Sequence, residues 1–245
     1  MKRIEKNIYK YFLLGAFIFL CTINCSDVFA KEKLLSAPMN PEFLAYMESI
    51  QKERILAPEF AYEGRGLGLI PSPLNLDYLT GINIFEARPS QTMESTKTPL
   101  RVGLPVSYDL RTQGKLTPVR DQSTGNTCWT FATYGSVESN LLPEETNDFS
   151  ENHIKNTHGF DWGYNSGGNA DMATAYLVRW GGPVNEADDP YNPNSGVSPS
   201  GLLSRKHVQG VIYIPARSSA FDNDNLKNAV MQAGAVYTTM YMSQD

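Results

Sequence analysis

Cys128 is the residue of this sequence best suited to covalent chemistry. It follows a polar run from Gln122 to Thr127 and precedes Trp129. If a helix begins at Thr127 or Cys128, the sulfur lies at the positive end of the helix dipole, which favours the thiolate. The side-chain amide of Gln122 and the backbone N–H of Cys128 are then placed to donate to a developing oxyanion. Trp129 is expected to shield the site on one side.

The other two cysteines lie in an N-terminal stretch typical of an export signal. Basic residues precede an apolar run from Tyr11 to Ile23, and Val28-Phe29-Ala30 forms a cleavage site of the small-x-small type. The run is short for a membrane-spanning helix, which needs about 20 residues. Residues 1–30 are therefore predicted to be a signal peptide, with a one-pass anchor as the alternative, and the mature protein is expected to be secreted or held at the cell surface.

Removal of this segment leaves Cys128 as the one remaining thiol, because Cys21 and Cys25 are lost with it. An intramolecular disulfide framework is then excluded. The remaining thiol is a nucleophile, an intermolecular link or a buried core residue. Composition alone favours the buried core residue.

The charge pattern excludes one class of partner. The formal net charge is -5 and the Lys and Arg residues are dispersed, so nucleic acid is not expected to bind. Residues 222–225 are rich in Asp and Asn but lack the spacing of a calcium loop, and a helix cap explains them better. The sequence therefore predicts no cofactor, no metal, and membrane contact only through the signal or an anchor. The oligomeric state is left open.

Hydrophobic periodicity predicts the helices that must position Cys128. After the cysteine, apolar residues recur at the spacing of one helix face until Pro143 ends the pattern. Ser150 is a good N-cap for a second, shorter helix. The face residues of the first helix are Phe131, Tyr134, Val137 and Leu141. Further helices are predicted over 41–56, over 170–180, and from a cap at Asn223 or Asp224 to Gln232. In the helix over 170–180, Met172, Ala175, Tyr176 and Val178 are expected to face inward. Strands are predicted over 208–214 and 235–242.

The order of these elements indicates an α+β fold with two lobes, because helices come first and strands follow a Pro/Gly/Ser/Asn-rich connection at 187–204. Residues 31–103 are instead punctuated by prolines and are interpreted as an extended, wrapping segment. Within it, residues 67–73 are expected to be extended and half-buried, and residues 87–98 to be a polar linker. Composition does not separate a prodomain from a structural N-terminal wrap.

Several short motifs together resemble the papain-like cysteine peptidases. Pro118 to Gln122, followed by Cys128 to Ala132, resembles the nucleophile region of that family. Residues 31–103 look like the N-terminal part of its exported bacterial and archaeal members. The remaining similarities lie within about 104–242. Ser107 to Arg111 resembles the start of the mature enzyme, Phe149 to Glu151 the second helix, and Ser166 to Gly168 the cleft glycines. Gly182 to Glu186 and Asp189 to Tyr191 resemble the segment leading to the second lobe, and Lys227 to Val230, together with Gly234 to Val236, resembles the helix and strand before the family histidine.

The resemblance implies a fold and a set of roles. Cys128 would be the nucleophile, Gln122 the oxyanion donor, and Gly167 and Gly168, beside Trp129, would bind the backbone of a protein or peptide substrate. The implied fold has a helical lobe, complete here, and a β-barrel lobe that is truncated. The chain accordingly divides into a signal peptide (1–30), an N-terminal wrap or propeptide-like segment (31–103) and a peptidase domain incomplete at its C-terminus (104–245).

Two departures from the family pattern bear on these expectations. Gly125 stands where the family usually has a cysteine that is disulfide-bonded near the cleft glycines, which costs stability but no chemistry. The family histidine and asparagine lie roughly 130–150 residues beyond the nucleophile, which is past residue 245. His153, His158 and His207 are interpreted as structural rather than as the base. The chain by itself is therefore expected to have no significant peptidase activity.

Two functions outside proteolysis are kept as alternatives. One is a non-catalytic exported protein that binds peptides in a papain-like cleft, and the other is a cell-surface structural protein with a buried cysteine. The spacing of Gln122 and Cys128 favours the peptidase, since a binding module has no need of it.

Overall fold

The structure is a computed structural model, and it describes residues 38–52, 61–62, 65–66, 68–85 and 104–240. These residues belong to one compact unit, which spans 38–245. The predicted signal peptide and the predicted linker at 87–98 lie outside the described residues. The first predicted helix is present as α2, Pro41–Lys52, and the remainder of its expected range lies outside the description.

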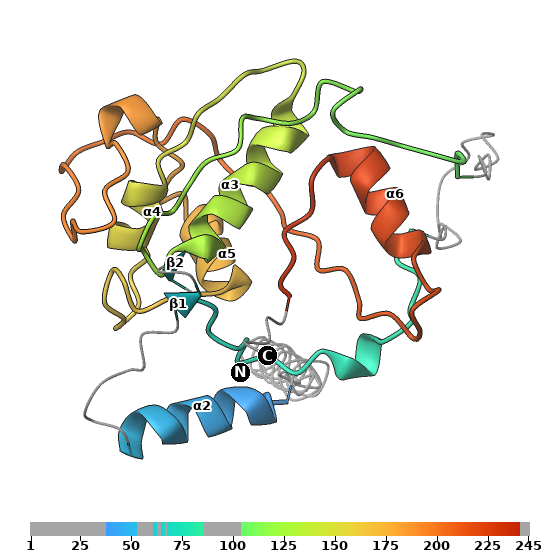
Figure 1. Cartoon of the computed structure of the whole chain (residues 1–245), viewed down its shortest axis with the longest axis horizontal. Helices are drawn as coiled ribbons and strands as arrows, with labels where there is room; N and C mark the ends of the chain where they lie inside the picture. The colour runs from blue at the N-terminus through green and yellow to red at the C-terminus, as the bar shows by residue number, and fades with distance from the viewer. Residues whose placement is uncertain (1–37, 53–60, 63–64, 67, 86–103, 241–245) are drawn as a thin grey trace, which may run out of the picture. The chain divides into compact units, whose positions relative to one another are not determined.

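Three helices form the part of the molecule that carries Cys128: α3 (Cys128–Leu141), α4 (Glu151–Thr157) and α5 (Ala170–Val178). Figure 1 shows α4 and α5 beside α3, and residues of all three are in contact. Side-chain caps define two of the starts, because Ser150 Oγ accepts from the backbone N–H of His153 at 2.9 Å and Asn169 Oδ1 accepts from that of Met172 at 2.9 Å.

The hydrophobic core lies where these helices meet. Burying this apolar surface is the main stabilising contribution to the helical part of the fold. The predicted inward residues Tyr134, Met172 and Tyr176 are buried, but Val178 is 46% exposed and its inward prediction was wrong. The helix ends at Val178 rather than at 180, so this residue lies in its last turn. The core cluster comprises Ile70, Trp129, Tyr134, Phe149, Ile154, Met172, Ala173, Tyr176 and Leu177.

The two predicted strands after residue 205 are not strands in this structure. Residues 208–214 and 235–240 have no regular secondary structure, and residues 241–242 lie outside the description. A strand requires a neighbouring backbone to complete its hydrogen-bond ladder, and no ladder to either segment occurs in the described part of the chain. The described strands are β1 (Ala61–Tyr62) and β2 (Arg65–Gly66), which pair antiparallel with Ala61 opposite Gly66.

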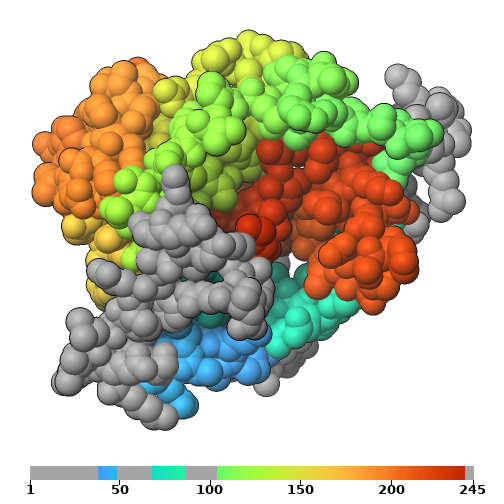
Figure 2. All heavy atoms as spheres, in the orientation of Figure 1, coloured from blue at the N-terminus to red at the C-terminus, as the bar shows by residue number. Residues whose placement is uncertain are grey.

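The last helix is α6, Asp224–Ala233, which follows the predicted boundaries closely. Asn223 is its N-cap residue but makes no side-chain capping bond, and its side-chain oxygen accepts from Arg217 at 2.8 Å instead. The C-terminal end of α6 is tied to α3, since Asn140 Nδ2 donates to the carbonyl of Ala233 at 3.0 Å. Figure 2 shows these late residues, in red, against the green residues of α3 and the segment before it. Two short 3-10 helices, η1 (Asp77–Leu79) and η2 (Glu186–Asp188), complete the described elements.

The N-terminal segment touches both parts of the fold. Ile70 is buried in the core, and residues 68–70 pair with Gly168. Farther along, Asn225 of α6 accepts from the backbone N–H of Ile84 at 3.0 Å and donates to the carbonyl of Ile82 at 2.7 Å. Phe43 and Tyr46 of α2 pack against the helical core. The described parts of 31–103 are therefore bound along the domain.

Candidate active site

Cys128 opens α3, as the sequence predicted, and its side chain is partly buried. Burial raises the pKa of the thiol above its ordinary value, although backbone hydrogen bonds from Gly68, Trp129 and Cys128 oppose the rise. The expectation that the helix start favours the thiolate is therefore corrected for this state. Desolvation outweighs the backbone N–H groups, and the neutral thiol is favoured.

The loop before Cys128 brings Gln122 back to the start of the helix. The Gln122 carbonyl accepts from the Gly125 N–H at 3.1 Å and from the Tyr191 hydroxyl at 2.9 Å. The same hydroxyl lies 2.7 Å from Thr127 Oγ1. One hydroxyl therefore links the residue that carries the expected oxyanion donor to the residue that precedes the nucleophile. The sequence motifs did not assign a role to Tyr191.

The two expected cleft glycines lie where only glycine fits. Gly167 has a φ of 88°, in the left-handed region, and a Cβ there would lie 2.5 Å from the carbonyl oxygen of Gly68. A Cβ on Gly168 would lie 2.5 Å from the Trp129 indole. Gly168 therefore rests against the residue next to the nucleophile, as the predicted grouping of these residues requires.

The backbone of Gly168 is already engaged by the N-terminal segment. Its N–H donates to the Gly68 carbonyl at 2.8 Å, and its carbonyl accepts from the Ile70 N–H at 2.9 Å. Leu69 and Gly168 form an isolated parallel bridge, and the amide of Asn169 donates to the carbonyl of Pro71 at 3.2 Å. The backbone groups of Gly168, one of the two glycines expected to hold a substrate, are thus bound to this chain's own residues 68–70.

Hydrogen bonds join the two loops at the position where the family pattern has a disulfide. Asn165 Oδ1 accepts from the Asn126 N–H at 2.7 Å, and Asn126 Nδ2 donates to the Asn165 carbonyl at 3.0 Å. These contacts lie one residue beyond Gly125 and two residues before Gly167. Since each hydrogen bond contributes about 1 kcal/mol net, the asparagine pair replaces part of the stabilisation that a covalent link would give.

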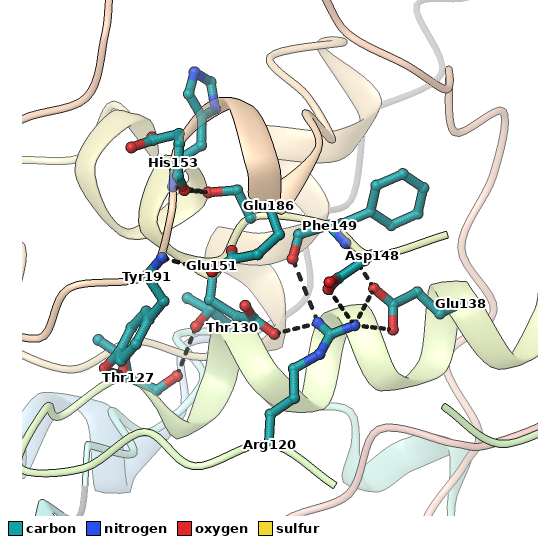
Figure 3. Close-up of polar contacts among 12 residues, drawn as sticks. Arg120, Thr127, Thr130, Glu138, Asp148, Phe149, Glu151, His153, Glu186 and Tyr191 are labelled. Carbon is teal, nitrogen blue, oxygen red and sulfur yellow. Dashed lines mark hydrogen bonds and ion pairs between the residues drawn. The ribbon is translucent and has the colours of Figure 1, made fainter. Parts of the chain in front are cut away.

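Arg120 organises the carboxylates behind this loop (Figure 3). Its guanidinium binds Glu138 at 2.8 Å, Glu151 at 2.7 Å and Asp148 at 2.7 Å. The side chains of Glu138 and Glu151 are only 1% exposed, so each requires a cation to remain charged in the interior. Arg120 thereby joins the segment before the nucleophile loop to α3 and α4.

Burial raises the pKa of Glu151 to about 7, against the opposing effect of Arg120. Its Oε2 atom has no hydrogen-bond partner among the described residues, which is consistent with a carboxyl that is easily protonated. A sequence signal for this network exists, because Glu138 lies four residues after Tyr134 on the buried face of α3. A charged residue on an apolar helix face indicates an ion partner elsewhere in the chain.

A hollow of about 540 Å³ adjoins this network, and its lining includes Arg120, Glu151, Glu186 and Tyr191. Cys128 does not line it. The hollow is therefore not the site of thiol chemistry.

Each of the three histidines has other partners among the described residues, and the ring of His158 also meets the edge of Trp129 with centroids 6.1 Å apart. His153 Nδ1 lies 2.6 Å from the Tyr176 hydroxyl, and His158 Nδ1 accepts from the Phe160 N–H at 3.0 Å. The ring of His207 stacks on Trp180 with centroids 4.4 Å apart. Burial lowers the pKa of both His153 and His158, so these two rings are neutral near pH 7. Their contacts agree with the structural roles expected from the sequence.

Within the part of the chain that the structure describes, no three His, Cys, Asp or Glu side chains gather in a way that would hold a metal ion. None of the described helices is both long and apolar enough to span a bilayer.

Comparison with known proteins assigns the family. The family model described as papain family cysteine protease matches residues 104–245, more than half of the chain. The chain therefore belongs to the papain family of cysteine proteases, and the two-lobe papain-like fold expected from its motifs is confirmed, with a helix-rich lobe and few strands among the described residues.

Individual relatives are similar over part of their length. Cysteine proteinase 2 of Entamoeba histolytica is 31% identical over 54% of this chain and 42% of its own. Probable cysteine protease RD21B of Arabidopsis thaliana is 33% identical over 50% of this chain and 30% of its own. The chain thus spans less than half the length of these curated relatives.

A solved structure is similar over most of the chain. It contains the cysteine protease and lectin-like domains of Cwp84, a surface layer associated protein of Clostridium difficile. The identity is 25%, the TM-score is 0.54, and the match covers 81% of this chain and 39% of that one.

Proposed function

We propose that this protein is a cysteine peptidase that uses Cys128 as its nucleophile. The sulfur attacks the carbonyl carbon of a peptide, and the resulting oxyanion accepts from the Gln122 amide and the Cys128 N–H. The C–N bond then breaks, and the amine leaves with the proton that the thiol gave up. Water then hydrolyses the thioester. Gly167 and Gly168, beside Trp129, bind the substrate backbone. The observation that carries this proposal is the Tyr191 hydroxyl, which bonds both Gln122 and Thr127 and so holds the two ends of the loop together.

The 245-residue chain by itself is expected to cleave peptides negligibly. Its three histidines have other partners, as described above, so none of them is proposed as the base and proton donor for the thiol. Robust peptide cleavage by this chain that disappears in Cys128→Ala would contradict this expectation.

An activated ester tests the nucleophile without requiring a histidine base. p-Nitrophenyl acetate transfers its acetyl group to a thiol: the S–C bond forms, the C–O bond breaks, p-nitrophenolate leaves and the thiol proton passes to water. We expect a burst of one equivalent that is absent in Cys128→Ala. Gln122→Ala should slow the burst at least 10-fold, because loss of one oxyanion donor costs about 100-fold or more in complete enzymes. Gln113→Ala, at an exposed glutamine, is the control.

The alternatives give different results. A non-catalytic peptide-binding protein would show a burst rate that does not depend on Gln122. A structural protein with a buried cysteine would react only after unfolding. Either result would overturn the peptidase proposal.

We further propose that the N-terminal segment covers the cleft, as a propeptide-like part of residues 31–103 ahead of a peptidase domain at 104–245. The support is that residues 68–70 use both backbone hydrogen-bonding groups of Gly168, while Ile70 is 2% exposed in the core beside Trp129. A substrate cannot use the same groups until this segment moves.

Introducing a charge at position 70 tests whether the N-terminal segment covers the cleft. Ile70→Asp should displace the segment, because a carboxylate is costly to bury without a partner, and alkylation of Cys128 by iodoacetamide should accelerate at least 10-fold. Leu69→Asp is the matched control, because Leu69 is 47% exposed. Equal alkylation rates in the two variants, with folding verified by circular dichroism, would contradict the proposal that the N-terminal segment covers the cleft.

Residues 1–30 are proposed to direct export, which places the protein outside the cell or at its surface with proteins or peptides as substrates. The surface layer association of the similar Cwp84 protein supports this location. N-terminal sequencing of the protein recovered from culture medium and cell envelope tests it; a chain that retains residues 1–30 in the cytosol would contradict it.

A further inference from the structure

The hydroxyl of Tyr191 joins both ends of the loop that precedes the nucleophile. A carbonyl can only accept, so the tyrosine hydrogen goes to the carbonyl of Gln122, at 2.9 Å. The hydroxyl of Thr127, 2.7 Å away, then donates to the tyrosine oxygen. Thr127 is fully buried, and its own carbonyl accepts from the Thr130 N–H in the first turn of α3 at 2.9 Å. The bridge therefore connects Gln122 to the helix start that carries Cys128.

Contacts on three sides fix the position of Tyr191. Its backbone N–H donates to Glu186 Oε1 at 2.6 Å, and its ring meets the edge of Phe131 with centroids 4.9 Å apart. The preceding segment is tied to the start of α4, where Ser150 Oγ donates to the Asp189 carbonyl at 2.6 Å. Figure 3 shows the Tyr191 side chain directed toward Thr127. The position of Tyr191 is thus fixed by Phe131 of α3 and, through Asp189, by Ser150 at the start of α4.

Gly125 leaves the space that the hydroxyl occupies. A Cβ at this position would overlap with the Tyr191 hydroxyl and lie 3.1 Å from Thr127 Oγ1. The loop therefore carries no side chain at the point where the bridge crosses it. The cysteine that the family pattern has at this position would require the bridge to move.

We propose that Tyr191 is a positioning residue that holds Gln122 at the distance from Cys128 that oxyanion donation requires. This inference rests on the proposed function, because Gln122 has an oxyanion to stabilise only if Cys128 attacks a carbonyl. A donor stabilises the developing charge only within hydrogen-bond distance of the oxyanion, and displacement by about 1 Å is enough to lose much of the rate. Tyr191 itself does not contact the reacting atoms.

Two rate constants separate positioning from general stability. The p-nitrophenyl acetate burst passes through an oxyanion, whereas alkylation by iodoacetamide does not. We expect Tyr191→Phe to slow the burst about 5- to 10-fold, which is smaller than the loss expected when the donor itself is removed. The alkylation rate should change less than about 2-fold, because alkylation forms no oxyanion. Tyr213→Phe is the matched control, since that hydroxyl also makes two hydrogen bonds, to Thr174 and Asp171 of α5. Both rates are measured in the wild-type and Ile70→Asp chains, so that a covered cleft does not mask the effect.

Double variants test whether Tyr191 acts through Gln122. The burst of Gln122→Ala/Tyr191→Phe should be no slower than that of Gln122→Ala. Gly125→Ala should slow the burst in the wild-type background, because its methyl group displaces the hydroxyl, and should add little in the Tyr191→Phe background.

The outcomes distinguish this inference from the proposed function. If Gln122→Ala leaves the burst unchanged, the oxyanion role is wrong and the positioning role falls with it. If Gln122→Ala slows the burst but Tyr191→Phe does not, or if Tyr191→Phe slows the burst and the alkylation equally, only the inference about Tyr191 is overturned.

Discussion

The helical half of the domain, α3 to α5 with the segment from Arg120 that leads into α3, and the later region, residues 205–240, are supported in different ways. The helical half surrounds a buried apolar core and contains the ion network of Arg120. The later region leaves large apolar side chains exposed, among them Ile212 at 68% and Phe221 at 94%. The helices satisfy their backbone groups internally, whereas extended segments depend on neighbours. The comparison shows that, among the described residues, the nucleophile side of the site is built from α3, α4 and their connecting loops rather than from strands.

The largest expected effect comes from deleting one arginine in each region. Arg120→Ala leaves Glu138 and Glu151 buried without their cation and should lower the free energy of unfolding by about 3–5 kcal/mol. Arg205→Ala removes a pair with Asp188 that is 47% and 37% exposed and should cost at most about 1 kcal/mol. Urea denaturation measures both. Similar losses would show that the two regions do not differ in electrostatic support.

Replacing one isoleucine in each region tests whether the two regions differ in packing. Ile154 is fully buried in the core, and Ile212 is 68% exposed. Ile154→Ala should destabilise the fold by about 2–5 kcal/mol, and Ile212→Ala by about 0.5 kcal/mol or less. Thermal unfolding of the two variants checks this. A large effect at Ile212 would mean that the later region is packed against a surface that the described residues do not include.

The smallest expected effect is a pH dependence to which Glu151, in the helical half, contributes. Burial raises the pKa of Glu151 to about 7, so the folded chain keeps a proton that the unfolded chain releases near its ordinary pKa. The free energy of unfolding should therefore fall as pH rises from about 5 to about 7, by at most about 1.4 kcal/mol per pH unit for one proton.

Charge-neutral variants identify the group that causes this pH dependence of the unfolding free energy. Glu151→Gln should flatten the dependence of the unfolding free energy on pH in this interval. Asp222→Asn should not, because hydrogen bonds from Ser218 lower the pKa of Asp222 and it titrates at more acidic pH. A slope unchanged by Glu151→Gln would assign the titration to another group.

The sequence by itself determined the helices and the local grouping around Cys128. A helix start needs only the residues next to it, and Ser150 caps α4 as predicted. The motif spacing likewise identified the family and placed Gly168 near the nucleophile, where it rests on Trp129. These features are local or are carried by short motifs, so periodicity and resemblance reached them.

Tertiary structure alone decided the features that join distant residues. The bond from Tyr191 to Gln122 spans 69 positions, and no local pattern marks it. The pairing of Gly68 with Gly168 and the burial that raises the pKa of Cys128 also depend on segments brought together only by folding. The predicted strands at 208–214 and 235–242 failed for the same reason, because β-branched sequence favours a strand but a partner backbone must complete it. Helix formation is local, whereas desolvation, side-chain bridges and sheet pairing are properties of the assembled fold.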